Sequence, residues 1–292
     1  MRDSVSYRVF SIGNIVFFLL LAVTMVFPLY KVFITSIITA REYYSSPLIL
    51  LPKTANLDAY RFIFSYSAAL SAIRVTVFVT VVGTFLSMLF TLLLSYALSK
   101  SFLPGCKIIH RLLLATMFIS PGLIPFYMLV RSLGLTNTIW VNIIPGLISL
   151  WNYLVIRSFF RQLPASLEEA ALIDGAGWGT VFFRIVIPLS LPVIATFTLF
   201  YAVGYWNAWW NAMLFCSDPT LQTLQLFLRR MIVTPELLDM QMNITGRGGG
   251  EVVYSESIKM AAVMVATVPI LAVYPFLQRY FTKGVMIGAI KG

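Results

Sequence analysis

The sequence has few charged residues: 11% of its 292 residues are Asp, Glu, Lys or Arg, whereas 59% are hydrophobic. Soluble domains carry about 25% charged residues, so this composition excludes an ordinary soluble globular protein. The apolar residues also occur in blocks long enough to cross a bilayer, which takes about 20 residues for each helix. The composition therefore predicts an all-α integral membrane protein.

Cysteine and histidine are scarce as well. The two cysteines, Cys106 and Cys216, fall on opposite sides of the membrane in the topology predicted below, so we expect no disulfide between them. The one histidine, His110, has no second His, Cys or carboxylate at ligand spacing, which argues against a metal site. We therefore predict no metal, no cofactor bound by this chain and no set of catalytic residues.

Six apolar blocks predict six transmembrane helices in a single membrane domain over residues 1–292. The first block is longer than the core of a signal peptide, which spans about 7–15 residues, so we expect it to be retained. The blocks run approximately over residues 12–34, 70–98, 108–130, 139–159, 189–215 and 258–280.

The basic residues set the expected orientation, because Lys and Arg are enriched in cytoplasmic loops. The formal net charge of +10 comes from residues scattered between the apolar blocks, without the clustering that binds nucleic acid. We expect both termini in the cytoplasm and the long 216–257 loop on the periplasmic or extracellular side. Glycines at 246–250 in this loop lack the order of a phosphate-binding loop and predict a flexible segment.

Acidic residues are missing from the predicted spans: all eleven Asp and Glu residues fall in loops or tails. Carriers driven by protons or ions usually keep an ionisable group within the bilayer. A secondary carrier or a channel of another class is therefore the less favoured alternative. A membrane-embedded enzyme would need convergent ionisable residues near the membrane, and none is visible. If the protein moves a substrate uphill, we expect the energy to come from another polypeptide.

The segment between the fourth and fifth blocks, residues 163–187, has the pattern of a small cytoplasmic helix-turn-helix. Ser166 followed by Glu169 forms a capping box, which predicts the start of a short helix. Glycines are expected to break this helix and to allow a tight reversal; they are Gly175, Gly177 and Gly179. A second short helix is expected to carry Trp178 and to end before Pro188. Such a projection suits a cleft in a partner protein.

The same segment resembles the EAA loop of the permeases of ABC importers. The match covers Glu168-Glu169-Ala170-Ala171-Leu172-Ile173-Asp174-Gly175-Ala176 and Ile187-Pro188. It is similar to carbohydrate-uptake permeases of the maltose-importer type, and Gly288-Ala289-Ile290-Lys291-Gly292 resembles the tail of their second permease. Residues 205–212 and 224–226 are similar to the lipo-oligosaccharide and alginate branch. The likeness covers nearly the whole chain and implies the fold of a type I ABC importer permease.

This resemblance implies a non-catalytic permease subunit of an ATP-driven saccharide importer in the bacterial cytoplasmic (inner) membrane. Its partners would be a second permease in a heterodimer, two ATPase subunits and an extracytoplasmic solute-binding protein. Mg-ATP would bind to the ATPase subunits, since this chain has no Walker sequence. Glu169 would meet a basic residue of an ATPase subunit. The residues expected to couple to the ATPase are Glu168, Glu169, Ala170, Ala171, Asp174, Gly175 and Trp178.

Aromatic and amide side chains at the end of the fifth block are candidates for a substrate pathway or gate. Sugars bind to aromatic faces and to amide groups, although Trp and Tyr also gather at membrane interfaces whatever the function. Helical spacing would place the tryptophans on one face and the asparagines on the next. The candidates are Tyr205, Trp206, Asn207, Trp209, Trp210 and Asn211, with Asn152 and Tyr153 of the fourth block as a second set.

Basic residues on the expected outer side suggest an acidic saccharide such as alginate, because positive charge attracts carboxylates. Ordinary solvation of loops explains the same residues without a substrate. They are Arg131, Arg229, Arg230, Arg247 and Lys259. The sequence does not name the sugar or the partner chains.

Overall fold

The structure, a computed structural model, describes residues 5–45, 49–119, 121–233 and 255–289, and every regular element in these ranges is helical. The chain forms two compact units: unit 1 is residues 1–70 and 228–268, and unit 2 is residues 71–227 and 269–292. The glycine cluster at 246–250, the part of the predicted outer loop from 234 to 254, and the last three residues of the C-terminal motif lie outside the described residues.

Unit 1 contains the first long helix and the ordered segment that follows it. Its elements include α1 (Val5–Ser36), α2 (Ala40–Ser45) and α3 (Asp58–Ser65). Side chains tie the segment down: Glu42 Oε1 accepts a hydrogen bond from the backbone of Lys53 at 2.7 Å, and Ser36 Oγ shares one with Tyr60 Oη at 2.8 Å. The connection between the first two long helices is therefore a folded structure of its own.

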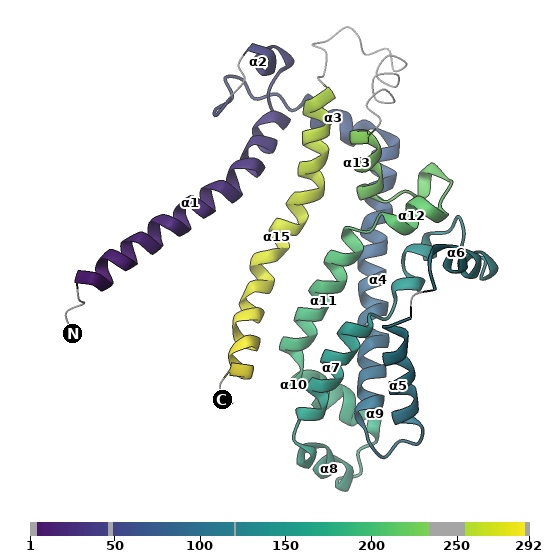
Figure 1. Ribbon diagram of the computed structural model, residues 1–292. Coiled ribbons are helices and arrows are strands. Elements are labelled where there is room, and N and C mark those ends of the chain that lie inside the picture. The colour runs from purple at the N-terminus through teal and green to yellow at the C-terminus, as the bar shows by residue number, and fades with distance from the viewer. Residues whose placement is uncertain (1–4, 46–48, 120, 234–254, 290–292) are drawn as a thin grey trace. The chain divides into compact units, whose positions relative to one another are not determined.

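Unit 2 holds most of the remaining helices, and Figure 1 shows α8 at one end of this unit, away from α6 and α12. The elements are α4 (Ser67–Ser99), α5 (Cys106–Thr116), α6 (Leu123–Ser132), two 3₁₀ turns (Ile139–Asn142 and Ile144–Gly146), α7 (Leu150–Gln162), α8 (Ala165–Ile173), α9 (Trp178–Val181), a π-helical turn (Phe182–Val186), α10 (Ile187–Leu189), α11 (Leu191–Trp206), α12 (Trp210–Phe215) and a 3₁₀ turn (Pro219–Leu221). Two further helices, α13 (Leu224–Val233) and α15 (Ser255–Ala289), have residues in both units, as does α4, whose residues 67–70 belong to unit 1.

Three helical stretches in the described part of the chain are long and apolar enough to cross a membrane: Val9–Ser36, Ser67–Ser99 and Ser255–Val273. Two bent pairs pass the same test, one at 139–162 with a bend of 46° and one at 178–215 with a bend of 83°. The count is therefore three spans, or up to five if each bent pair is one span. The expected continuous helix over 108–130 is instead two shorter helices, α5 and α6.

Proline and glycine account for the breaks that the hydropathy pattern does not reveal. Pro121 cannot donate a backbone hydrogen bond, and Gly122, which precedes α6, has a φ of 79°, a conformation that suits glycine. Pro145 lies between the two 3₁₀ turns, and Pro188 and Pro192 flank the bend at Ser190. Within a bilayer such breaks need polar partners inside the protein.

A row of hydroxyl side chains runs along α4, and we call it the hydroxyl stripe. Its members are three or four residues apart and so share one face of the helix. Ser87 Oγ and Tyr205 Oη share a hydrogen bond of 2.8 Å, and Thr91 Oγ1 and Tyr201 Oη share another of 2.8 Å. The stripe consists of Thr76, Thr80, Thr84, Ser87, Thr91 and Ser95. It joins α4 to α11 by polar contacts of the kind that hold membrane helices together.

The close approach of α11 to α4 depends on a glycine next to the stripe. A Cβ atom on Gly83 would lie 2.9 Å from two ring atoms of Tyr205, closer than packed carbon atoms approach one another. Tyr205 is buried, and its ring is held by the hydrogen bond from its hydroxyl to Ser87. Gly83 therefore sets the distance between the two helices at this level.

Candidate coupling segment and substrate pathway

The 163–187 segment forms the expected helix-turn-helix, but both of its helices differ from the prediction. The second helical stretch continues through Pro188 to Leu189, and the next helix begins at Leu191. Helix α8 starts at Ala165 with Pro164 as its N-cap, and no side chain caps its first turn. The predicted capping box of Ser166 and Glu169 is therefore wrong. The fixed φ of Pro164 suits the start of a helix, so the helix begins before Ser166 and includes it.

The reversal after α8 depends on one glycine more than on the others. Gly175 follows the C-cap residue Asp174 and has a φ of 84°, in the left-handed region that ends many helices. Gly179, in contrast, lies inside α9, so the prediction that it breaks the helix is wrong. Trp178 begins α9 and packs against Phe102 with 5.0 Å between the ring centroids.

The two neighbouring glutamates of α8 have different environments. Glu168 is 8% exposed, and its carboxylate forms an ion pair with the ammonium group of Lys100, the residue that follows α4. The same ammonium group lies 4.7 Å from the centre of the Tyr96 ring. Of the two glutamates, only Glu169 is therefore exposed.

The outer face of the segment combines this carboxylate with apolar side chains. Ile173 is 86% exposed, and Trp178 is 42% exposed. Ala170 and Asp174 are exposed too, whereas Ala171 is partly buried and packs against the main core of unit 2. The structure thus brings most of the predicted coupling residues to one projecting turn and leaves Glu168 and Ala171 on its inner side.

The end of the fifth block differs from the single helical surface that the sequence suggested. Helix α11 ends at Trp206 and α12 begins at Trp210. The predicted shared faces are therefore wrong, because the helical period is interrupted. Asn207 Nδ2 donates to the carbonyl of Val203 at 3.0 Å, and Asn211 Nδ2 donates to the carbonyl of Val141 at 3.2 Å. Each amide stabilises a different backbone break.

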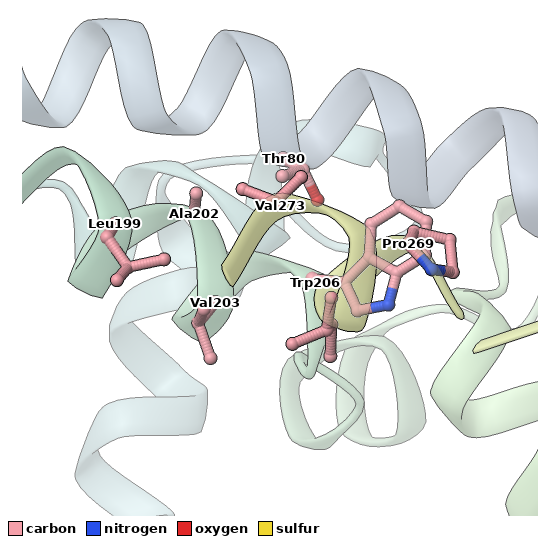
Figure 2. Close-up of a pocket in the computed structure, with 8 residues that line it drawn as sticks. Thr80, Leu199, Ala202, Val203, Trp206, Pro269 and Val273 are labelled. Atoms are coloured by element: carbon pink, nitrogen blue, oxygen red, sulfur yellow. The ribbon is translucent and has the colours of Figure 1, made fainter. Parts of the chain in front are cut away.

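The aromatic residues of this region are separated as well. Tyr205 is buried against α4, while Trp210 is 47% exposed and contacts Trp209 edge to face. Trp206 lines a partly open, apolar cavity of about 200 Å³, together with Thr80 and Pro269 (Figure 2). Its remaining lining residues are Leu199, Ala202, Val203, Ile270 and Val273. An indole face in such a cavity can stack on the apolar face of a ring, whereas the Thr80 hydroxyl is buried and does not face the cavity.

The second candidate set, in α7, is part of the packed core. Tyr153 is fully buried, and its hydroxyl shares a hydrogen bond of 2.9 Å with His110 Nδ1. Arg157 lies 3.3 Å from the other ring nitrogen of His110 and donates through Nε to the carbonyl of Leu98 at 2.7 Å. Asn152 is also buried. These contacts bind α4, α5 and α7 together.

Sequence reasoning missed two polar residues. Asn142 is 3% exposed, and neither side-chain atom of its amide has a hydrogen-bond partner among the described residues. The other is Lys100, which pairs with Glu168. The regular spacing of hydroxyls in α4 is a sequence signal for the polar face of that helix. A lysine directly after a long apolar helix was a weaker signal.

Other sequence expectations concern cysteines, metals and outer charges. Cys106 and Cys216 are both free and buried, and burial raises the pKa of the Cys216 thiol, so it is a poor target for labelling. No cluster that could hold a metal ion occurs among the described residues. Lys259 is paired with Glu256 at 2.9 Å, and Arg247 lies outside the described residues. Two of the five basic residues thus give no support for an acidic substrate.

Comparison with known proteins identifies relatives over the whole chain. Residues 1–287 match the family described as binding-protein-dependent transport system inner membrane component. The chain is 42% identical to the polygalacturonan/rhamnogalacturonan transport system permease protein YtcP of Bacillus subtilis, covering 94% of this chain and 96% of that protein. It is 40% identical to protein LplC of the same organism, covering 100% and 98%.

A solved structure is similar as well. It is a bacterial ABC transporter involved in the import of the acidic polysaccharide alginate, with a TM-score of 0.87 and 28% sequence identity. The match covers 96% of this chain and 99% of that chain. The helices and their order are therefore those of a permease of an ABC importer.

We predict that Asn211→Leu lowers stability more than Asn207→Leu. The first change leaves the buried carbonyl of Val141 without its side-chain partner, at a cost of about 1–3 kcal/mol. Asn207 is exposed, so water can replace its contact with Val203. Thermal unfolding of the purified protein in detergent measures both effects. Equal losses in the two variants would contradict the structural role of Asn211.

Proposed function

The chain belongs to the family of binding-protein-dependent transport system inner membrane components, and from this premise we propose how it works in a complete importer. It is a permease of a sugar ABC importer and lies in the inner membrane. In the proposal it pairs with a second permease to enclose the pathway, and a solute-binding protein delivers the saccharide. Two ATPase subunits bind and hydrolyse Mg-ATP, and this chain carries out no catalysis.

The proposed energy input is the 163–187 segment, which docks into a groove of an ATPase subunit. The observation that carries this assignment is the projecting turn formed by α8 and Gly175. Glu169 and Ile173 are exposed one helical turn apart on α8, and Trp178 is exposed at the start of α9. A groove that receives it needs a basic residue for the carboxylate and an apolar wall for the other two side chains. Nucleotide-driven closure of the ATPase subunits then moves the segment as a rigid body.

The proposed topology has six crossings with both termini in the cytoplasm. The three long helices and the two bent pairs account for five crossings, and α5 with α6 makes the sixth. The loop after α4 and the 163–187 segment then lie on the cytoplasmic side, where ATP is available. The segment that contains α12 lies on the outer side, where the solute-binding protein delivers its ligand.

The proposed substrate is an oligosaccharide with carboxylate groups. Two relatives support this class: the polygalacturonan/rhamnogalacturonan permease from Bacillus subtilis and the alginate importer of known structure. In this chain Trp206 in its cavity and the half-exposed Trp210 offer aromatic faces for sugar rings. The buried Tyr205 and the paired Asn211 act as supports for these groups rather than as direct contacts.

We predict that Glu169→Lys abolishes substrate-stimulated ATP hydrolysis by the assembled importer, because a second positive charge would repel the basic residue expected in the groove. The matched control is Lys107→Glu, which reverses the charge of another exposed residue, in α5. ATP hydrolysis by proteoliposomes, with and without the loaded binding protein, measures the effect. Normal stimulation in Glu169→Lys would rule out the docking role.

The topology predicts which side of the membrane each loop faces. In a background with both native cysteines replaced by alanine, Ser101→Cys should react with a membrane-impermeant maleimide only after the cells are permeabilised. Ser132→Cys should react in intact cells, since both positions are exposed and lie at opposite ends of the α5–α6 crossing. The reverse labelling pattern would invert the orientation.

The substrate class can be tested on the solute-binding protein that copurifies with the complex. We expect it to bind trigalacturonate or an alginate trisaccharide at least about tenfold more tightly than maltotriose, a difference of about 1.4 kcal/mol. Isothermal titration measures the three affinities at the same ionic strength. Equal or tighter binding of the neutral trisaccharide would exclude the acidic class.

A further inference from the structure

The ion pair between Lys100 and Glu168 connects two parts of the molecule that are far apart in the chain. Glu168 belongs to α8, and Lys100 directly follows α4. The side chains of the pair are 16% and 11% exposed, so the contact is largely shielded from water. A second contact lies beside it, because the Tyr96 ring of α4 packs 4.9 Å from the Phe182 ring, centroid to centroid. The 163–187 segment therefore contacts the C-terminal end of α4 through an ion pair and a ring contact.

The other end of this connection is the hydroxyl stripe. Thr91 and Ser87 bind the hydroxyls of Tyr201 and Tyr205, each at 2.8 Å. The Tyr201 hydroxyl also accepts a hydrogen bond from the backbone of Ser149 at 2.9 Å. Helix α4 is thus bonded to α11 and to the start of α7 through the same row of side chains. A displacement of α4 along its axis moves both tyrosines.

The backbone connection from α8 to the membrane helices is more flexible than these side-chain contacts. On its downstream side the chain passes through Gly175-Ala176-Gly177 before α9 begins. Glycine has the widest backbone freedom of all residues, so this linker is less rigid than a helix, although backbone hydrogen bonds from Gly175 to Leu172 and from Ala176 to Ala171 hold its first part. On the upstream side Leu163 and Pro164 separate α7 from α8. The side-chain contacts with α4 are therefore the more rigid connection between α8 and the membrane helices.

The C-terminal end of α4 stabilises its contacts with basic residues through its partial charge. The carbonyls of the last helical turn carry a partial negative charge, which favours cations nearby. Arg157 donates to the carbonyl of Leu98 at 2.7 Å, and Lys100 follows at once. A buried charge that loses its partner is strongly unfavourable. Lys100 and Glu168 therefore resist being pulled apart more than an exposed pair would.

We propose that Lys100 is a positioning residue for energy coupling, which passes the movement of α8 through its ion pair with Glu168 to α4, and from there to Tyr201 and Tyr205 on α11. This rests on the proposed docking of the 163–187 segment to an ATPase subunit. The two glutamates then have different roles: Glu169 binds the ATPase subunit, and Glu168 transmits the movement of α8 to the membrane helices.

The test uses the complete importer in proteoliposomes and a reporter that needs no saccharide. A cysteine introduced by Trp210→Cys, in the background without native cysteines, reports through its rate of reaction with maleimide. Trapping the ATPase subunits with ATP and vanadate should change that rate in the parent. Lys100→Met should reduce the change about tenfold, within the range usual for coupling between sites. The ATPase subunits should still copurify and hydrolyse ATP at the parental basal rate.

Two further variants separate a positioning role from a general loss of folding. The charge swap of Lys100→Glu with Glu168→Lys should restore most of the response, because the pair can form in the opposite sense. Lys100→Met with Glu168→Gln should remain folded but uncoupled, because neither charge is left alone. The matched control, Lys107→Met, removes an exposed lysine and should respond as the parent does.

The outcomes are distinct. A full response in folded Lys100→Met, or in the double neutral variant, would overturn the positioning role and leave the docking proposal standing. Failure of the charge swap to restore any response in an assembled complex would also overturn it. If trapping leaves the labelling rate unchanged in the parent itself, while Glu169→Lys keeps normal ATP stimulation, the docking proposal fails and the inference fails with it.

Discussion

The structure depends on the rule that a polar group in the hydrocarbon of a membrane must find its partner within the protein. The hydroxyl stripe of α4 follows this rule through Ser87 and Thr91, each of which meets a tyrosine of α11. Gly83 permits the short distance that these bonds need, since any side chain there would collide with the Tyr205 ring. A hydroxyl row and one glycine thus fix the pairing of α4 and α11, where purely apolar faces would leave their register open.

The same rule explains why the broken helices are tolerated. The residues between Ile139 and Ser149 do not form a continuous α-helix, so their backbone groups need other partners. Asn211 supplies one at Val141, and Tyr201 supplies another at Ser149. The polar side chains that the sequence suggested as a sugar site therefore stabilise the backbone of the broken helices. The proposed substrate contacts are the aromatic residues that remain accessible, Trp206 and Trp210.

Much of the organisation could be predicted from the sequence, because composition and a spaced motif are local signals. The blocks at 12–34 and 70–98 correspond to α1 and α4, and the 163–187 segment does form two short helices joined at Gly175. The sequence could not show that Glu168 turns inward, since its partner Lys100 is 68 residues away. It also could not place the end of α11 at Trp206, because the residues at 205–210 include no proline or glycine and the bond from Asn207 to the Val203 carbonyl becomes visible only in the structure.

In the proposed coupling, the opposite orientations of Glu168 and Glu169 separate recognition from transmission within two consecutive residues. The inner carboxylate pairs with Lys100, whereas Glu169 is exposed and forms no ion pair with the described residues. The exposed side of α8 can therefore change without breaking the contact between Lys100 and Glu168. In the proposed coupling, such a permease accommodates a different ATPase subunit through changes at a few surface side chains, while the inner contact stays the same.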